Sequence, residues 1–327
     1  MAGLWVIGEV TADGGLARIS TEVATLARTL AAEAGQDVAG IVVAADPAAA
    51  ATELATYLPR VLAVADPAAA DQPWSMVAAE RLVAQLGKET EGSILVGAGP
   101  DGRDVAGALS ALTGWGVLAN AVAASWTDGG PNVEMSVFGG KLTTTSAFTG
   151  KIGIVTVRPN VVTAEPAEAA GSVEKVEPVG DLGQPAVSVV DRIEEAGAAA
   201  PIEEARVIVS GGRGVGGPDG FKLVEEIAAA LGGAVGATRA AVDAGWIPYA
   251  QQIGQTGKIV KPQLYLALGI SGAIQHKVGM QTAETVVAVN RDPDAPIAEF
   301  ADLVVIGDLF EVGPAILSEL RARQGSG

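Results

Sequence analysis

Residues 264 to 276 read Leu-Tyr-Leu-Ala-Leu-Gly-Ile-Ser-Gly-Ala-Ile-Gln-His, an apolar run followed by two glycines around a serine and then by the only histidine of the 327 residues. The run predicts a buried strand that ends at Gly269 and a helix that begins at Gly272. A turn of this kind leaves backbone N–H groups without partners beside the positive end of a helix dipole. It is therefore typical of a phosphate site. We expect His276 on the first helical turn, close to the group that the phosphate carries.

Two polar residues follow later strands of the same region. Asn290 ends an expected strand at Thr285 to Val289, and Asp308 follows one at Leu303 to Ile306. Polar residues at the carboxyl ends of successive parallel strands line the crevice where open α/β sheets bind nucleotides. A lone histidine is also compatible with an ordinary structural role, but these neighbours favour a nucleotide site.

Two further glycine-rich loops carry an arginine each. The loop from Ser210 to Asp219 contains Arg213, whose fork of donors suits phosphate. The loop from Gly236 to Gly245 contains Arg239 between small residues, where it can lie against a flat ligand or pair with Asp243 on the surface. Either loop alone is equally consistent with a solvated turn.

The segment Gly254-Gln-Thr-Gly-Lys258 is a tight turn but not a P-loop, because Ile259 stands where Ser or Thr is needed. It offers Gln255 and Thr256 as hydrogen-bonding side chains. Hydrolytic chemistry fits poorly, since no Gly-x-Ser-x-Gly elbow occurs in the sequence. An arginine, a threonine and a histidine around a nucleotide instead suit a redox cofactor.

Apolar runs alternate with Ala-rich helical stretches through most of the chain, which predicts parallel α/β sheets. In the first part, strands are expected at Leu4 to Glu9, Val38 to Val43, Arg60 to Val64 and Ser93 to Val96, with helices near residues 19–34, 71–87 and 103–113. Closely spaced strands at Val117 to Ser125, Val133 to Phe138, Leu142 to Ala147 and Ile152 to Val157 then predict mixed or antiparallel additions to the same sheet.

The segment from Ala196 to Ala205 has the composition of a linker and follows an expected charged strand at Val187 to Glu195. We therefore expect an N-terminal α/β domain over residues 1–195, a linker over 196–205 and a doubly wound parallel-sheet domain over 206–327. In the last, further elements are expected at Val207 to Ser210 (strand), Asp219 to Leu231 (helix), Leu264 to Leu268 (strand) and Glu311 to Ala322 (helix).

Composition excludes several classes of protein. The absence of cysteine excludes disulfides, zinc ribbons, iron–sulfur ligation and thiol catalysis, and a single histidine excludes a His-rich site, so no metal is expected. A net charge of −17 argues against nucleic acid and anionic membranes as partners. The start of the chain reads as a strand rather than a signal peptide, and no apolar stretch is long enough to span a bilayer. A soluble cytoplasmic protein is expected.

The acidity is unevenly distributed. Residues 206–327 hold 10 Lys and Arg against 12 Asp and Glu, whereas residues 1–205 hold 11 against 26. The later part is therefore nearly neutral and would tolerate a bound anion.

Six segments resemble, in order, the C-terminal FAD domain of the electron transfer flavoprotein alpha subunit. They begin at Val209 (Val-Ser-Gly-Gly-Arg-Gly), Thr238 (Thr-Arg-Ala-Ala-Val-Asp-Ala-Gly), Ile253 (Ile-Gly-Gln-Thr-Gly-Lys), Pro262, Gly269 (Gly-Ile-Ser-Gly-Ala-Ile-Gln-His) and Asn290 (Asn-Arg-Asp-Pro-Asp-Ala-Pro-Ile). The resemblance is specific over residues 206–320. It is looser over 1–195, where Thr156-Val-Arg-Pro-Asn160 is its clearest element.

The resemblance implies an electron carrier rather than a substrate-transforming enzyme. Its partners would be a beta subunit that holds AMP and contacts the first domain, acyl-CoA dehydrogenases of fatty acid β-oxidation as donors, and a membrane quinone oxidoreductase as acceptor. Family members commonly have Ser where this chain has Thr238, which keeps the hydroxyl. An NAD-dependent dehydrogenase or a non-catalytic nucleotide-binding module would use the same crevice and stays an alternative. The dehydrogenase would be expected to show Gly-x-Gly-x-x-Gly, of which only Gly97-Ala-Gly99 is present.

The resemblance also implies roles for individual residues around one FAD. Arg213 and the Ser271 to Gln275 turn would face the pyrophosphate and ribityl chain, and Asn290 and Asp308 the adenosine. Arg239 would lie over the isoalloxazine, Thr256 near flavin N5, and His276 near the pyrimidine carbonyl, where it would act as a donor that tunes flavin charge. The complete implied set is Arg213, Thr238, Arg239, Ile253, Gly254, Gln255, Thr256, Ser271, Gly272, Ala273, Ile274, Gln275, His276, Asn290, Asp308 and Leu309.

Overall fold

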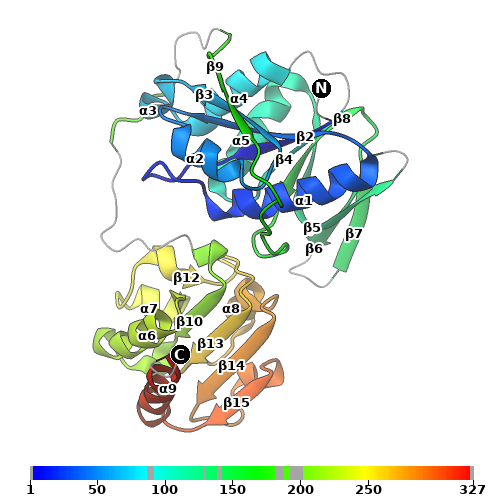
Figure 1. Ribbon diagram of the computed structural model, residues 1–327. Helices are drawn as coiled ribbons and strands as arrows, with labels where there is room; N and C mark the ends of the chain where they lie inside the picture. Colours follow the sequence, from blue (N-terminus) through cyan, green and yellow to red (C-terminus); the bar gives the residue numbers. More distant parts are fainter. Residues whose placement is uncertain are drawn as a thin grey trace. The chain divides into compact units, whose positions relative to one another are not determined.

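A computed structural model describes residues 3–86, 92–127, 130–137, 142–180, 187–191 and 202–324. The contacts between residues divide the chain into two compact units, Met1–Ile193 and Glu194–Gly327, and each has its own sheet (Figure 1). Both units are layered α/β structures. The α/β class and the two kinds of sheet agree with the expectation from the sequence.

The first unit is built on a nine-stranded mixed sheet in the order β7-β6-β5-β8-β4-β1-β2-β3-β9. The strands β5, β6 and β7 pair antiparallel, and the other pairs are parallel. The chain moves from β1 to β2 and β3 on one side and returns to β4 on the other, so the strand order reverses between β1 and β4. The strands are β1 (Leu4–Gly8), β2 (Val38–Ala44), β3 (Arg60–Ala65), β4 (Gly92–Gly97), β5 (Gly116–Thr127), β6 (Gly130–Val137), β7 (Leu142–Ala147), β8 (Ile152–Val157) and β9 (Ser172–Val176).

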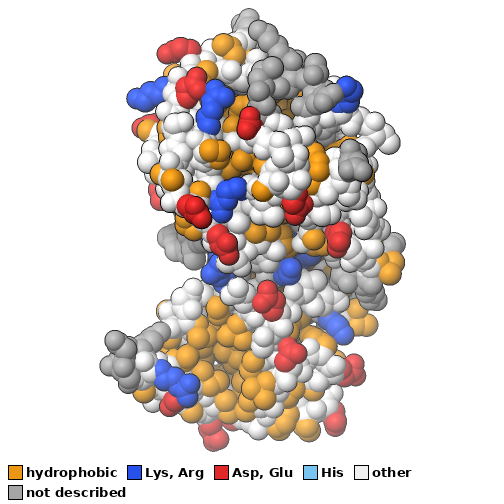
Figure 2. All heavy atoms as spheres, turned by 45° about the vertical axis from the view of Figure 1, so that its right-hand side comes forward, with side chains coloured by type: hydrophobic (Ala, Val, Ile, Leu, Met, Phe, Trp, Pro, Cys, Tyr) orange, Lys and Arg blue, Asp and Glu red, His pale blue; other side chains and the backbone are white. Residues whose placement is uncertain are grey.

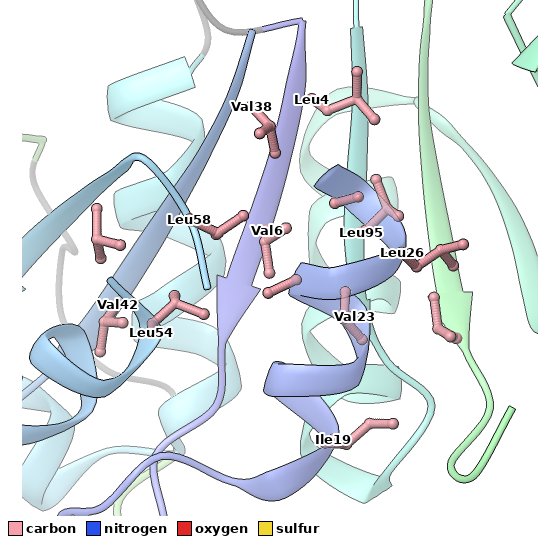
Figure 3. Packing of buried hydrophobic residues seen from close by; sticks show 14 of the residues in the cluster. Leu4, Val6, Ile19, Val23, Leu26, Val38, Val42, Leu54, Leu58 and Leu95 are labelled. Carbon is pink, nitrogen blue, oxygen red and sulfur yellow. The ribbon is translucent and has the colours of Figure 1, made fainter. Parts of the chain in front are cut away.

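Helices cover both faces of this sheet because successive residues of the central strand β1 point to opposite sides. Val6 packs with Val23 of one helix and Leu54 of the next (Figure 3). Ile7 packs with Leu82 and other residues of the opposite layer. Burying each such side chain contributes about 1.5–3 kcal/mol. The helices are α1 (Arg18–Ala34), α2 (Ala48–Leu54), α3 (Ala68–Asp71), α4 (Trp74–Leu86) and α5 (Pro100–Thr113).

The second unit is built on a six-stranded, all-parallel sheet in the order β12-β11-β10-β13-β14-β15. The chain proceeds from β10 outward to β12, then returns to β13 beside β10 and proceeds to β15. The strand order therefore reverses between β10 and β13, as in a doubly wound fold. The strands are β10 (Val207–Gly211), β11 (Ala234–Thr238), β12 (Gln252–Ile253), β13 (Leu264–Leu268), β14 (Thr285–Asn290) and β15 (Leu303–Ile306).

Two hydrophobic clusters sandwich this second sheet. On one face, Val209 packs with Phe221 and Leu317. On the other, Ile208 and Tyr265 pack with Met280. The helices are α6 (Pro218–Ala230), α7 (Arg239–Asp243), α8 (Ile274–Met280) and α9 (Leu309–Gln324), and the 3₁₀ turns are at Ile202–Glu204, Arg213–Val215, Tyr249–Gln251 and Pro296–Glu299.

Several local expectations differ from the structure. The helix expected over residues 71–87 is two helices, because Pro73 has no N–H to continue the first one. Residues 187–191 form no strand, and Val190 is 95% exposed, so no neighbouring strand pairs with them. The helix α2 and the strands β9, β11 and β12 were not anticipated, since Ala-rich or short segments give weak periodicity.

Parts of two expected features lie outside the described residues. They are Phe138 at the end of an expected strand, and residues 192–201, which include the end of the expected charged strand and most of the expected linker. The last linker residues are described: Ile202–Glu204 form a 3₁₀ turn, and Ile202 is buried in the second unit. Among the helices of the described ranges, none is long and apolar enough to cross a membrane.

Candidate functional site

The carboxyl ends of six parallel strands form one edge of the second sheet, because all pairs in this sheet are parallel. All the site residues expected from the sequence lie on this edge or just after it, except His276, which lies beneath it. Arg213 follows β10, Arg239 follows β11 and Gly254 follows β12. The Gly269 to Ala273 turn follows β13, and Asn290 ends β14. A parallel sheet therefore gathers segments that are up to about a hundred residues apart in sequence.

The loops after β10 and β13 cross at the point where the strand order reverses. The Gly212 N–H donates to Leu268 O at 3.0 Å, and the Gly214 N–H donates to Gly269 O at 3.0 Å. A Cβ on Gly214 would lie 2.7 Å from the Gly269 Cα, and Gly269 has a positive φ of 62°. Only glycine allows the two backbones to approach so closely.

The Gly269 to Ala273 turn presents backbone donors. Among the described residues, the N–H groups of Ser271 to Gln275 have no protein acceptor, and no side chain caps α8. The Asn290 Nδ2 donates to Ile270 O at 2.9 Å and so fixes the turn against the end of β14. Because α8 has only seven residues, the free N–H groups matter more here than the helix dipole.

His276 is buried and has partners on both ring nitrogens. Its Nδ1 lies 3.1 Å from Ile253 O, and its Nε2 lies 2.9 Å from the Tyr265 hydroxyl. A carbonyl only accepts, so Nδ1 carries the proton and Nε2 accepts from Tyr265. Burial lowers the pKa of His276 to about 4, which keeps the ring neutral.

The role expected for His276, a donor to a flavin carbonyl, stays a prediction. Among the described residues, the single ring proton of the neutral imidazole is donated to Ile253 O. Sequence reasoning treated Tyr265 only as part of an apolar strand and missed it as the partner. The available signal was a hydroxyl-bearing residue inside an otherwise aliphatic run, since a buried Tyr hydroxyl usually requires a partner.

The two arginines are both exposed. Arg213 lies in the 3₁₀ turn after β10 and has no ion pair among the described residues. The Arg239 Nε donates to Asp243 Oδ2 at 3.1 Å, and these side chains are 66% and 61% exposed. The surface pairing that the sequence left open is therefore present, and it leaves other guanidinium N–H groups available for a ligand.

Two threonines lie at this edge, Thr238 at the end of β11 and Thr256 in the turn after β12. The hydroxyl oxygen of Thr238 is shielded from solvent and has no hydrogen-bond partner within the described ranges. Thr256 is exposed and is held by the Gln252 Nε2, which lies 3.1 Å from Thr256 O and 3.2 Å from its Oγ1. The Gln255 N–H donates to Gln275 O at 2.7 Å, so the turn from Gly254 to Lys258 is joined to α8.

The end of β15 carries an ionised carboxylate. Asp308 accepts the Phe310 N–H at 2.9 Å and pairs with Arg291. These contacts, the first above all, lower the pKa of Asp308. Leu309 beside it is buried and packs under Gly269. No group of three or more metal-ligating side chains is found in the part of the chain that the structure describes.

Known proteins resemble both units. Residues 201–281 match the family model of the electron transfer flavoprotein FAD-binding domain, and residues 4–180 match that of the electron transfer flavoprotein domain. Electron transfer flavoprotein subunit alpha of Mycobacterium leprae is 42% identical over 332 residues, covering 99% of this chain and 100% of that protein. The Bacillus subtilis subunit alpha is 35% identical, covering 97% of this chain and 96% of that protein. The mitochondrial subunit alpha of Arabidopsis thaliana is 57% identical over 116 residues, covering 36% and 32%.

Proposed function

Because the chain belongs to the electron transfer flavoprotein alpha-subunit family, we propose that it holds FAD as one half of a heterodimer with a beta subunit. In this proposal the protein is an electron carrier of the cytoplasm and transforms no substrate. It takes electrons from acyl-CoA dehydrogenase-type flavoenzymes of fatty acid β-oxidation. It passes them to a membrane quinone oxidoreductase, and the beta subunit holds AMP.

The observation that carries the proposal is the single edge where six parallel strands end. It brings the turn at Ser271 to Gln275, the loop at Arg213 and the loop at Thr256 to one side of one sheet. This is the place where doubly wound sheets bind nucleotides. FAD, when bound there, supplies the electron transfer chemistry.

The residues present fit such a ligand. The N–H groups of Ser271 to Gln275 have no acceptor among the described residues, and a pyrophosphate supplies acceptors. The Thr238 hydroxyl is shielded yet has no partner in the part of the chain that the structure describes, which costs free energy until a ligand provides one. Arg213, with no ion pair among the described side chains, adds a charged donor that suits the same pyrophosphate.

The chain's own residues then have distinct tasks. Arg213 and the Ser271 to Gln275 turn bind the phosphates, while Asn290, Asp308 and Leu309 bound the adenosine end. Arg239 and Thr256 lie at the flavin end. A cation or donor near the flavin stabilises negative charge more in the reduced than in the oxidised form, so Arg239 raises the reduction potential. Asp243 opposes part of that effect.

An exposed apolar surface on the second unit supports a subunit partner. Figure 2 shows hydrophobic side chains gathered over one face of this unit. Leu303, Ile306 and Phe310 are 55%, 52% and 46% exposed. Apolar area of this kind is typical of protein interfaces.

Co-purification tests the proposal directly. The chain is co-expressed with its beta subunit, and the complex is examined by absorption spectroscopy and by identifying the nucleotide released on heating. We expect a yellow complex that releases FAD and accepts electrons from a reduced acyl-CoA dehydrogenase. A colourless complex that takes up no FAD contradicts the proposal and favours a regulatory nucleotide module, and release of NAD favours a dehydrogenase.

A further inference from the structure

The turn from Gly254 to Lys258 folds onto one buried polar residue, Gln252. Gln252 belongs to β12 and is 3% exposed, whereas Thr256 in the turn is exposed at the sheet edge. A Cβ on Gly257 would lie 2.3 Å from Gln252 O and 2.9 Å from Gln252 Cγ, so the turn packs directly against this residue. The Lys258 N–H donates to the same carbonyl at 2.7 Å, which closes the turn around Gln252.

The side chain of Gln252 contacts Thr256 twice. Its Nε2 lies 3.1 Å from Thr256 O and 3.2 Å from Thr256 Oγ1. A carbonyl oxygen only accepts hydrogen bonds, so the nitrogen of the carboxamide, and not its oxygen, must face Thr256 O. The orientation of the Gln252 amide is therefore determined by a group that has no alternative role.

This orientation determines what the Thr256 hydroxyl can do. A carboxamide nitrogen donates and does not accept, so Thr256 Oγ1 is the acceptor in its contact with Gln252 Nε2. The proton of the hydroxyl then points away from Gln252. Because Thr256 is exposed, this proton is available to a ligand at the sheet edge.

We propose that Gln252 is a positioning residue that makes the Thr256 hydroxyl a hydrogen-bond donor toward the cofactor. The consequence rests on the proposed function, in which Thr256 lies at the flavin end. The ring acceptors of a flavin gain negative charge on one-electron reduction, so a hydroxyl that donates to one of them stabilises the reduced form more than the oxidised form. Gln252 thus raises the reduction potential through Thr256, without contact with the flavin.

The side-chain amide of Gln252 reports this hydrogen bond with or without the cofactor. The heterodimer is prepared with ¹⁵N-glutamine in this chain, and the spectrum of Gln252→Met identifies the Nε2 signals of Gln252. We expect these protons to exchange with solvent at least about tenfold more slowly than those of an exposed glutamine, both with FAD bound and after its release.

Variants of Thr256 test the contact from its other side. In Thr256→Val, the exchange of the Gln252 Nε2 protons should become about tenfold faster, the effect of one lost hydrogen bond, and in Thr256→Ser it should match the wild type. Wild-type protons that exchange as in an exposed glutamine, or exchange that is unchanged in Thr256→Val, overturn the proposal.

The flavin potential tests the direction of the hydroxyl. Thr256→Val should lower the equilibrium constant of the first one-electron reduction about tenfold, or about 59 mV, and Gln252→Met should lower it in the same direction. The double variant should show no further loss beyond Thr256→Val, because Gln252 acts only through the hydroxyl. Losses that add, or a wild-type potential in Gln252→Met, overturn the proposal.

Tyr249→Phe is the matched control. The Tyr249 hydroxyl donates to Thr256 O at 2.8 Å, so this variant removes a donor from the same turn and leaves the contact between Gln252 Nε2 and Thr256 Oγ1 in place. The flavin potential should therefore stay at the wild-type value. An equal loss in Tyr249→Phe and Gln252→Met would show that the firmness of the turn, rather than the direction of the hydroxyl, sets the potential, and would overturn the proposal.

The outcomes separate this proposal from the proposed function. If the heterodimer takes up no FAD while the Gln252 amide behaves as expected, the fixed hydroxyl stands and the proposed function fails. If FAD is bound but the amide protons are not protected, the positioning role is wrong and the proposed function stands. If Gln252→Met does not fold, exchange in Thr256→Val and Thr256→Ser decides, because these variants change an exposed residue and keep Gln252.

Discussion

Both units contain a reversal of strand order in their sheet, but different groups lie at the reversal point in each unit. In each sheet the strand order reverses once, between β1 and β4 in the first unit and between β10 and β13 in the second. Such a point is where open α/β sheets bind ligands. In the first unit it is filled by a side chain of the protein, and in the second it is lined by backbone donors that have no acceptor among the described residues.

Glu9 fills the reversal point of the first unit. It follows β1 and is 5% exposed, and its backbone N–H donates to Ser20 Oγ at 2.9 Å. A side chain on Gly97 would collide with the Glu9 Oε1, and a Cβ on Gly102 would lie 2.9 Å from it. The glycines before and within the first turn of α5 thus make room for a carboxylate, where a nucleotide-binding sheet makes room for a phosphate.

This difference shows that a reversal of strand order creates a possible binding position. The side chains that lie there decide whether a ligand can occupy it. The Gly97-Ala-Gly99 pair is explained by Glu9, which removes the remaining sequence support for a dinucleotide site in the first unit. Among the described residues, no protein acceptor meets the N–H groups of the turn from Ser271 to Gln275. Substitutions at the two reversal points, and a change of pH, test this difference between the units.

Gly269→Ala should abolish the open site of the second unit. It adds a Cβ 2.9 Å from Gly214 C and 2.7 Å from its Cα, at a φ of 62°. We expect a loss of about 3 kcal/mol or more in the free energy of unfolding and loss of FAD. Gly216→Ala is the control, because its φ of 81° carries a similar local cost but no atom lies within 4 Å, so it should cost about 1 kcal/mol and keep FAD. Equal losses in chemical denaturation would contradict the crossing of the two loops as the cause.

Acid should weaken the second unit through His276. Its pKa is about 4 when folded and about 6.5 when unfolded, so between these values the unfolded chain binds a proton that the folded chain does not. The free energy of unfolding is then highest above pH 6.5 and falls as the pH drops toward 4, by up to about 3 kcal/mol. Denaturation at pH 7 and pH 4.5 checks this, and the pH-dependent loss should be smaller by that amount in His276→Gln. Identical pH profiles for the two proteins would show that the ring is not buried and neutral.

Glu9→Ala should empty the filled site of the first unit. The Glu9 carboxylate lies against the first turn of α5. Removing this buried group leaves a cavity and lowers the free energy of unfolding by about 2 kcal/mol. Thermal unfolding measures this cost. The FAD content should stay at one per heterodimer, because Glu9 belongs to the other unit. A loss of FAD at unchanged stability would contradict the assignment of the cofactor to the second unit.

Thr238→Val should affect the ligand and not the fold. The hydroxyl has no partner among the residues that the structure describes, so replacing it with a methyl group should leave the unfolding free energy of the FAD-free protein unchanged or slightly higher. The dissociation constant for FAD should rise about tenfold, the effect of one lost hydrogen bond. Thr238→Ser, which keeps the hydroxyl, is the matched variant for titration with FAD and should bind as the wild type does. Unchanged FAD affinity in Thr238→Val would show that no ligand atom meets this oxygen.

Arg239 and Asp243 should shift the flavin potential in opposite directions. Arg239→Ala should lower the first reduction potential by some tens of mV, where about 59 mV is tenfold in the one-electron equilibrium. Asp243→Asn should raise it by a smaller amount, because it removes the charge that opposes Arg239. Both variants should keep FAD during potentiometric titration. No change in either variant would remove Arg239 from the flavin end.

The periodicity of the sequence was sufficient for four of the six strands of the second sheet. The strands at Val207, Leu264, Thr285 and Leu303 begin where expected, because parallel strands buried on both faces are continuous apolar runs. The site edge followed from the same runs, since parallel strands end on one side. The short strands β11 and β12 and the helix α2 did not follow, because their few residues carry little periodic signal.

The sequence by itself determined the class of fold, the glycine turns and the family, because these depend on local patterns and on motifs that are contiguous in the chain. Only the tertiary structure decided which of two equivalent reversal points is open. Glu9 and Gly97 are 88 residues apart, and Tyr265 and His276 belong to different elements. These side chains meet only after the sheets have formed. Whether a carboxylate fills a reversal point, and which group hydrogen-bonds to the histidine, therefore depends on tertiary contacts. The turn at Gly269 therefore remains the candidate phosphate site, and His276, which follows it on α8, is buried.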